Sequence, residues 1–342
     1  MWLERPAATL LYLMSMKVSV VITTYNQEDF IAQAINSVLS QEVNFDYEII
    51  IGENASTDRT REIVVEIQAK NPDKIRVLLR DPVDAERDRA AGVGGKSGFV
   101  NCLRACQGQY VALLDGDDYW TDVHKLQTQA DFLEEHPEYA ICFHNAKVLR
   151  ANGGSGPETF CPLDQKKTFS LEDLLAGNFI FSGSTMFRRG LFADLPDWFY
   201  TTPTGDWPLH ILNAQHGKIG YLSAVMAVYR IHGDSWWSSK PAPPQLLAQI
   251  ELLDNINAHL IFRYDRKIKD TQYRSYAELA ELAYQEGDLI GSRNFLEKCL
   301  KAGLANYRLP SAHQMGRLFK LHNPTFFNLI RSLRNFVYPH RS

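Results

Sequence analysis

Three carboxylates in four residues, Asp115, Asp117 and Asp118, follow directly on the apolar run 110–114. The run predicts a buried strand, and in open α/β sheets ligands bind beyond the carboxyl ends of the strands. Carboxylates at this spacing repel one another unless a cation lies among them, and oxygen ligands suit Mg²⁺ or Mn²⁺ beside substrate phosphates. A solvated acidic turn is the alternative. The position at a strand end favours a metal and phosphate site.

A further carboxylate, Asp206, comes just before a helix predicted over 208–216. Pro208 suits the first turn of that helix, and a carboxylate at a helix N-terminus is stabilised in its charged form. A charged carboxylate can take a proton from a reacting hydroxyl. Asp206 is therefore a candidate general base, with a plain helix cap as the alternative.

The glycine-rich segment 92–96, which ends at Lys96, superficially resembles a phosphate-binding loop. It lacks the spacing of the P-loop motif, so that interpretation fails. The remaining hypothesis is a mobile loop over 81–98, in which Lys96 or Arg89 contacts a phosphate and which closes over a ligand.

Alternating strands and helices must position these side chains. Helix starts are predicted at Asn26, capping a helix whose apolar face includes Ile31 and Val38, and at 56–58. Strands separated by helices predict right-handed βαβ units and a parallel sheet. The apolar, β-branched runs that predict its strands are Val18–Ile22, Tyr47–Ile51, Ile75–Leu79 and Tyr110–Leu114.

The chain after Pro241 is predicted to be almost entirely helical. Residues 276–303 resemble one tetratricopeptide-type helical hairpin, with its turn at Gly287 and Asp288. A single hairpin of this kind cannot bury its own apolar face. We therefore interpret it as a helical cap on the preceding domain.

Three segments in order, KVSVVITTYNQEDFIAQAINSVLSQ, YEIIIGENASTDRT and GQYVALLDGDDYW, make the chain resemble the family 2 inverting glycosyltransferases over residues 16–237. The resemblance implies the GT-A fold, an α/β architecture with a Rossmann-like, mostly parallel central sheet flanked by helices. It divides the chain into an N-terminal extension (1–15), a glycosyltransferase domain (16–240, with a nucleotide-binding half at 16–120 and an acceptor half at 121–240) and a helical C-terminal region (241–342).

The resemblance also implies a nucleotide pocket. Thr23 and Tyr25 correspond to residues that line the base pocket, and Asn54 stands where the family usually has an Asp that accepts a hydrogen bond from uracil. Asn also offers a carbonyl acceptor, so the match is compatible with uridine. Glu53 replaces the other common Asp in a supporting role, and Asp115, followed by Gly116, is expected near the ribose.

For the chemistry, the resemblance implies Asp117 on the metal that bridges the two phosphates, with Asp118 holding the loop. His232 is expected to complete the metal shell or to contact the diphosphate, and a structural histidine is the alternative. Arg230 would offset the charge of the leaving group, and Asp206 stands at the position of the catalytic base. The tryptophans Trp207, Trp236 and Trp237 are candidates for packing on sugar faces or in the core.

The function expected is metal-dependent inverting transfer of a sugar from a nucleotide-sugar, with a UDP-sugar favoured, to a hydroxyl of a glycan or lipid-linked acceptor, in cell-surface polysaccharide or glycolipid assembly. Two alternatives stay open. One is a non-catalytic protein that binds nucleotide-sugars or glycans. The other is a nucleotidyltransferase, which is disfavoured because residues 23–26 read Thr-Thr-Tyr-Asn rather than a glycine-rich phosphate signature.

Composition excludes several other classes. Of 342 residues, 45% are hydrophobic and 22% charged, which excludes a disordered chain, collagen and a coiled coil. The longest apolar runs are far shorter than a membrane span. Five cysteines without a Cys-x-x-Cys pair indicate reduced thiols in a cytoplasmic protein. The acidic body, with 28 basic and 40 acidic side chains outside 298–342, argues against a nucleic-acid partner.

The C-terminal tail is basic, because residues 298–342 hold eight Lys or Arg and no Asp or Glu. Within it, 324–337 shows an apolar stripe at helical spacing. Apolar burial combined with cations predicts a helix that lies peripherally on the inner face of a membrane. Packing of the stripe on the helical cap is the alternative.

Overall fold

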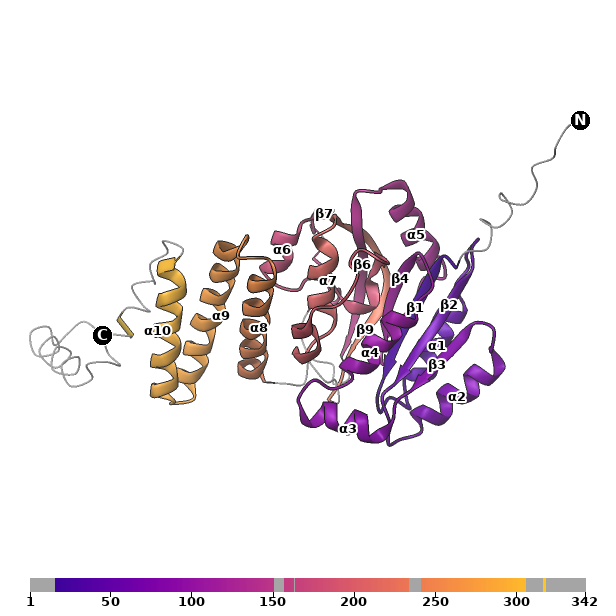
Figure 1. The fold of residues 1–342 in the computed structure, drawn as a ribbon, viewed down its shortest axis with the longest axis horizontal. Helices are drawn as coiled ribbons and strands as arrows, with labels where there is room; N and C mark the ends of the chain where they lie inside the picture. Colours follow the sequence, from indigo (N-terminus) through magenta and orange to yellow (C-terminus); the bar gives the residue numbers. More distant parts are fainter. Residues whose placement is uncertain (1–15, 151–156, 163, 234–240, 306–315, 318–342) are drawn as a thin grey trace, which may run out of the picture. The chain divides into compact units, whose positions relative to one another are not determined.

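The computed structural model describes residues 16–150, 157–162, 164–233, 241–305 and 316–317 (Figure 1). Predictions for 1–15, Trp236, Trp237 and 324–337 lie outside the described residues. The chain divides into two compact units. The first unit comprises residues up to Leu174 and from Asn178 to Ser239, and the second comprises Leu175–Gly177 and residues from Lys240 onward.

The first unit is built on one sheet, with the strand order β3-β2-β1-β4-β8-β6-β9-β5 and β7 paired to β9. Four strands from the first 120 residues are mutually parallel, as the sequence predicts. These are β1 (Val18–Thr24), β2 (Tyr47–Glu53), β3 (Ile75–Leu79) and β4 (Tyr110–Asp115). The helices that alternate with them are α1 (Ile31–Leu39), α2 (Thr60–Lys70), α3 (Pro82–Ala90) and α4 (Lys96–Ala105).

The second half of the sheet is mixed. Strand β8 (Met186–Arg188) lies antiparallel between β4 and β6 (Tyr139–Arg150), and β9 (Lys218–Ile231) runs parallel to β6. The short strands β5 (Tyr119–Trp120) and β7 (Thr168–Phe169) both pair antiparallel with β9. The helices of this half are α5 (Lys125–Glu135), α6 (Leu171–Leu175) and α7 (Asp206–Ala214).

Burial on both faces explains why the central strands are continuous apolar runs. Every residue of β2 is buried, and Val20 and Ile22 of β1 are fully buried. Helix α1 covers them with an apolar face at i, i+3, i+4 and i+7, which comprises Ile31, Ala34, Ile35 and Val38. The α/β architecture expected from the sequence is thus confirmed.

Two predicted helix starts are wrong, as is the predicted loop. Helix α1 begins at Ile31 with Phe30 as its N-cap, because the side chain of Asn26 (φ 50°) bonds to Thr57 instead of capping the helix. Helix α2 begins at Thr60 rather than at 56–58. Most of 81–98 is helical, since Asp81 caps α3 through the backbone N–H groups of Val83 and Asp84.

The second unit contains α8 (Ala242–His259), α9 (Asp265–Gln285) and α10 (Leu289–Ala305). Helices α9 and α10 form the predicted hairpin, and Gly287 takes the positive φ of 83° that its turn requires. The hairpin buries Tyr273 against Cys299, and Ser292 Oγ donates to the Ala280 carbonyl at 2.8 Å. Among the described residues, no helix has the length and apolar character needed to cross a membrane.

Candidate active site

The carboxyl ends of β1, β2 and β4 meet at one edge of the sheet and bring the predicted site residues together. Thr23 lies opposite both Gly52 and Asp115 in the strand register. Its Oγ1 donates to Asp115 Oδ1 at 3.3 Å, and its carbonyl accepts from the Gly116 N–H at 2.9 Å. A Cβ on Gly116 would come within 2.4 Å of Gln27 Oε1, so the loop after β4 packs tightly against the loop after β1.

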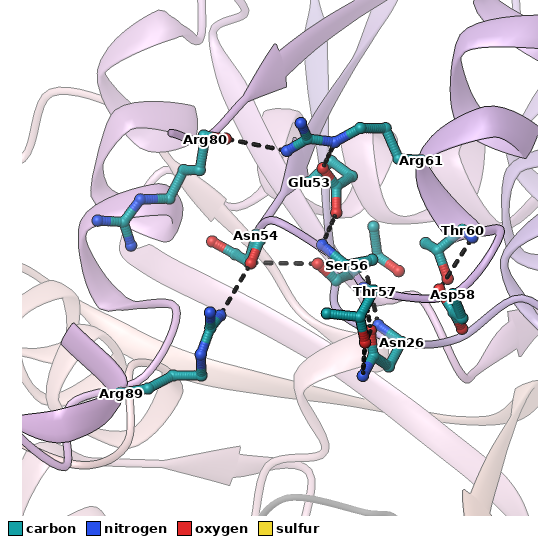
Figure 2. Close-up of polar contacts among 11 residues, drawn as sticks. Asn26, Glu53, Asn54, Ser56, Thr57, Asp58, Thr60, Arg61, Arg80 and Arg89 are labelled. Carbon is teal, nitrogen blue, oxygen red and sulfur yellow. Dashed lines mark hydrogen bonds and ion pairs between the residues drawn. The ribbon is translucent and has the colours of Figure 1, made fainter. Parts of the chain in front are cut away.

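Glu53 holds the loop after β2 in place (Figure 2). One carboxylate oxygen of this fully buried residue accepts from the Ser56 N–H at 2.6 Å, and the other pairs with Arg61 Nε at 2.5 Å. Arg61 also donates to the Arg80 carbonyl at 2.9 Å. Both oxygens of Glu53 are thereby engaged within the protein, which matches a supporting rather than a ligand-contacting position.

Polar side chains also join the loops after β1 and β2 (Figure 2). Asn26 Oδ1 accepts from the Thr57 N–H at 2.8 Å, and Asn26 Nδ2 donates to Thr57 Oγ1 at 3.1 Å. Asp58 accepts from the backbone N–H of Thr60 at 2.9 Å and of Glu28 at 3.1 Å, and these bonds lower the pKa of its carboxyl despite the opposing effect of burial. These hydrogen bonds therefore hold the loops after β1 and β2 together at this edge of the sheet.

Asn54 directly follows β2, and only one of the two polar atoms of its side-chain amide has a hydrogen-bond partner among the described residues. Its Nδ2 donates to the Thr24 carbonyl at 3.3 Å, whereas its buried Oδ1 has no hydrogen-bond partner among the described residues. Arg89 donates to the Asn54 carbonyl at 3.2 Å (Figure 2). Its guanidinium lies 4.8 Å from the centre of the Tyr25 ring. Buried polar atoms are almost always satisfied, so an amide oxygen without a partner suits a ligand with an N–H donor. The exposed Tyr25 ring, which contacts the same Arg89, suits stacking on a planar group.

The carboxylates after β4 are crowded. Burial, followed by the charges of Asp117 and Asp206, raises the pKa of Asp115 to about 7. Burial, followed by the charges of Asp117 and Asp115, also raises the pKa of Asp118 well above its usual value. Asp118 Oδ1 accepts from the Arg230 N–H at 2.7 Å and so ties this loop to the end of β9. Its place agrees with the loop-holding role expected for Asp118.

Arg230 and His232 bring the end of β9 to the acidic loop. The Arg230 guanidinium donates to the Asp117 carbonyl and lies 4.5 Å from the centre of the Tyr119 ring. His232 Nε2 lies 3.0 Å from Asp117 Oδ2, and the Phe30 ring packs 5.0 Å from the imidazole, centre to centre. The side chains of Asp117 and His232 are 15% and 12% exposed, so the pair is enclosed but reachable.

This pair fits a divalent cation. A carboxylate oxygen beside an imidazole nitrogen, within a cluster of carboxylates whose charge is poorly balanced, is a donor set that Mn²⁺ or Mg²⁺ accepts. No group of three or more such side chains converges on one point among the described residues. Such a cation would therefore take Asp117 and His232 from the protein and its other ligands from phosphate and water, as Mg²⁺ commonly does.

Asp206 is the first residue of α7 and faces the same cluster. Its Oδ2 accepts from Asn178 Nδ2 at 3.1 Å, and its charge contributes to the raised pKa of Asp115. No sequence motif marked Asn178, because only the fold brings it to Asp206. Trp207, by contrast, is buried and donates from Nε1 to the Leu174 carbonyl at 3.0 Å, so it packs in the core rather than on a sugar.

Lys96 is the predicted site residue whose surroundings differ most from expectation. It is the first residue of α4, only 3% exposed, and its ammonium donates to Thr202 Oγ1 at 3.2 Å and to the Thr204 carbonyl. Burial lowers its pKa to about 7, against the opposing influence of the Asp206 carboxylate. The ammonium thus contacts the segment that leads into α7.

Comparison with known proteins finds relatives over much of the chain. An uncharacterized protein of Mycobacterium tuberculosis is 38% identical over 222 residues, which are 65% of this chain and 60% of that protein. A GalNAc(5)-diNAcBac-PP-undecaprenol beta-1,3-glucosyltransferase of Campylobacter jejuni is 26% identical over 78% of this chain and 84% of its own. The chain thus spans about 60% of the length of the mycobacterial relative.

Solved structures share the fold. The crystal structure of Staphylococcus aureus TarS 1–349 in complex with UDP superposes with a TM-score of 0.60 at 19% identity, covering 90% of this chain and 86% of that one. A mannosyltransferase from Pyrobaculum calidifontis in complex with GDP-Man and Mn²⁺ superposes with a TM-score of 0.51 at 14% identity, covering 93% and 82%. Residues 19–195, more than half of the chain, match the model of Glycosyl transferase family 2. The chain therefore belongs to the family 2 glycosyltransferases.

Proposed function

We propose that this protein is a metal-dependent inverting glycosyltransferase that moves a sugar from a UDP-sugar to an acceptor hydroxyl. The observation that carries the proposal is the convergence of the Asp117–His232 pair with Asp115 and Asp206 at one edge of the sheet. A nucleotide-sugar needs both parts of this arrangement, because its diphosphate carries negative charge and its acceptor must lose a proton.

The base of the donor is proposed to bind at Asn54. The free Oδ1 of Asn54 is an acceptor for the imide N–H of uracil, and Tyr25 is 37% exposed and offers a ring face for stacking. Thr23 bonds to Asp115 and Gly116 at the start of the acidic loop, where the ribose is proposed to sit. The UDP and UDP-GlcNAc bound to the structurally similar TarS support a uridine donor.

Asp206 is proposed to act as the general base. Its carboxylate takes the proton of the acceptor hydroxyl while that oxygen attacks the anomeric carbon from the face opposite the diphosphate, and the bond to the departing diphosphate breaks with inversion. Asn178 orients the carboxylate through its 3.1 Å hydrogen bond, and Arg230 adds positive charge near the diphosphate. A cation held by Asp117 and His232 would neutralise charge that develops on the leaving group.

The acceptor is proposed to be a glycan or a lipid-linked glycan, in cell-surface polysaccharide or glycolipid assembly. The undecaprenol-linked substrate named for the Campylobacter relative supports a lipid-linked class. All five cysteines are free and buried, which suits a reducing cytoplasmic location. Peripheral contact of 324–337 with the membrane remains a prediction, because that segment lies outside the described residues.

Replacement of Asp117 tests the metal assignment. In the Asp117→Ala variant, we expect UDP release to lose its dependence on Mn²⁺ and UDP-sugar affinity to fall, because the cation that would offset the charge of the diphosphate loses its carboxylate ligand. The measurement is UDP release from a panel of UDP-sugars with and without Mn²⁺, together with donor affinity by calorimetry. Wild-type affinity and metal response in the variant would contradict the assignment. Wild-type protein that binds donors but never releases UDP would favour the non-catalytic alternative.

Replacement of Asp206 tests the base. We expect Asp206→Asn to bind donor and Mn²⁺ normally but to transfer sugar about 10²–10⁴-fold more slowly, since an amide keeps the shape but cannot accept the proton. The rate is measured at saturating donor, and donor affinity is the internal control. Transfer within a few-fold of wild type would mean that Asp206 only caps α7.

A further inference from the structure

Lys96 is an unusual residue for the interior of this protein. Burying an unpaired ammonium is costly, so a lysine that is 3% exposed requires compensating contacts. Lys96 has three, all to one stretch of chain: Thr202 Oγ1 at 3.2 Å, the Thr204 carbonyl, and the face of the Phe199 ring at 4.6 Å from its centre. These contacts fall within the eight residues that end at Asp206.

Two more side chains of α4 support the same stretch. A Cβ on Gly205, the residue before Asp206, would come within 2.9 Å of the Phe99 ring and 3.6 Å of Lys96 Nζ, so α4 packs directly against the backbone at this point. Arg104, two turns further along, donates to the Tyr200 hydroxyl at 2.9 Å. Helix α4 therefore packs against the segment 199–206 and supports it.

The first turn of α4 has a different neighbour on its other side. Gly95 and Gly98 pack against the amide of Asn54, where a Cβ on Gly98 would lie 2.2 Å from Oδ1. Ser97 Oγ donates to Asp88 at 2.6 Å and ties this turn to α3. The glycines thus line the proposed base pocket, while the Lys96 ammonium is directed to the segment 199–206 instead.

We propose that Lys96 is a positioning residue for Asp206, which fixes the segment 199–206 through Thr202 and Thr204 and does not contact the donor diphosphate. The inference rests on the proposed role of Asp206 as base. The Asp206 carboxylate also attracts the Lys96 ammonium electrostatically. Two further titratable groups interact electrostatically with Asp206, namely Asp115 on β4 and the buried His210 on α7.

The test is a separation of kcat from donor binding. We expect Lys96→Met to lower kcat by at least about tenfold, since a misplacement of about 1 Å costs up to 10²-fold, while UDP affinity and donor KM stay within twofold of wild type. Thr202→Val, which removes one of the two acceptors of the ammonium and keeps the side-chain shape, is expected to give a smaller loss of the same kind. Lys74→Met, at an exposed lysine near Tyr47, is the matched control.

A double-mutant cycle distinguishes positioning from general structural support. In the Asp206→Asn background, we expect Lys96→Met to change the residual transfer rate less than twofold, because no base remains to be positioned. An equal fold-loss in both backgrounds would overturn the proposal, as would a raised donor KM with unchanged kcat, which would put Lys96 on the donor.

Failure of the proposed base role of Asp206 would give a different pattern of transfer rates. If Asp206→Asn alone transfers sugar at the wild-type rate, the base assignment fails before Lys96 is tested, and the positioning role fails with it. If Asp206→Asn is inactive but both Lys96→Met and Thr202→Val keep full kcat, only the positioning role fails. Should Lys96→Met not fold, Thr202→Val in the two backgrounds decides the matter, because its smaller change leaves the ammonium in place.

Discussion

At the scale of single residues, close approach of backbone to side chain shapes the proposed nucleotide pocket. Gly98 lies inside α4, where glycine normally costs about 1 kcal/mol relative to alanine. Here a Cβ would come within 2.2 Å of Asn54 Oδ1 and 3.2 Å of Arg80 Cδ. The Asn54 amide therefore fits against the first turn of α4 only because residue 98 has no side chain. Glycine at this position allows that contact, although it does not favour the helix.

Gly98→Ala should consequently weaken UDP binding by at least tenfold, because the methyl group displaces the Asn54 amide that we propose reads the base. The measurement is calorimetric titration with UDP. Helical propensity alone would predict an unchanged dissociation constant and a slightly more stable protein. An unchanged dissociation constant would show that the Asn54 amide can move without weakening UDP binding and does not contact the base.

At the scale of elements, α4 links two sites because its faces have different partners. Its glycines contact Asn54, whereas Lys96, Phe99 and Arg104 support the segment 199–206. The arrangement requires a cation in a buried position, and burial lowers the pKa of Lys96 to about 7. The free energy of unfolding is therefore lower at those pH values at which the folded protein must keep this ammonium charged.

The sign of the resulting pH dependence follows from proton binding. Between pH 7 and about 10.4, the usual value for lysine, the unfolded chain holds a proton on Lys96 that the folded protein has released, so the free energy of unfolding rises with pH. We expect wild type to gain as much as about 1.4 kcal/mol per pH unit over Lys96→Met in this range. Urea unfolding of both proteins at pH 6.5, 7.5 and 8.5 measures the difference. A difference independent of pH would mean that the ammonium is well solvated.

At the scale of the whole molecule, the two compact units have separate cores, and the proposed site belongs to one of them. Every proposed donor, metal and base residue belongs to the first unit. The second unit has its own buried side chains on α8, α9 and α10, among them the fully buried Leu253. Damage to its core should therefore leave the site chemistry intact.

Leu253→Ala is expected to destabilise the second unit by about 2–5 kcal/mol through the cavity that it leaves, without changing the dissociation constant of UDP. Leu126→Ala, at an equally buried leucine of the first unit, is the matched comparison. In the proposed function UDP binds the native first unit, so we expect UDP to raise the temperature at which that unit unfolds in both variants. A large loss of UDP affinity in Leu253→Ala would show that the second unit shapes the donor site.

The sequence alone determined the parts of this protein that depend on local pattern. Apolar runs located the parallel strands, the carboxylates after 110–114 indicated a site at a strand end, and the turn at Gly287 located the α9–α10 hairpin, because strand and helix periodicities are properties of neighbouring residues. The family resemblance then indicated what chemistry those residues suit, and the comparisons confirmed the family and the fold.

Only the tertiary structure decided what depends on contacts between distant residues. It brought Asn178 to Asp206 and His232 to Asp117, with separations of 28 and 115 positions along the chain. It also directed Lys96 toward Thr202, turned most of the expected loop at 81–98 into helix, and left Asn26 outside α1 with a positive φ. A sequence pattern records which faces are apolar, but the direction of a buried polar side chain follows from which partners the packed chain offers it.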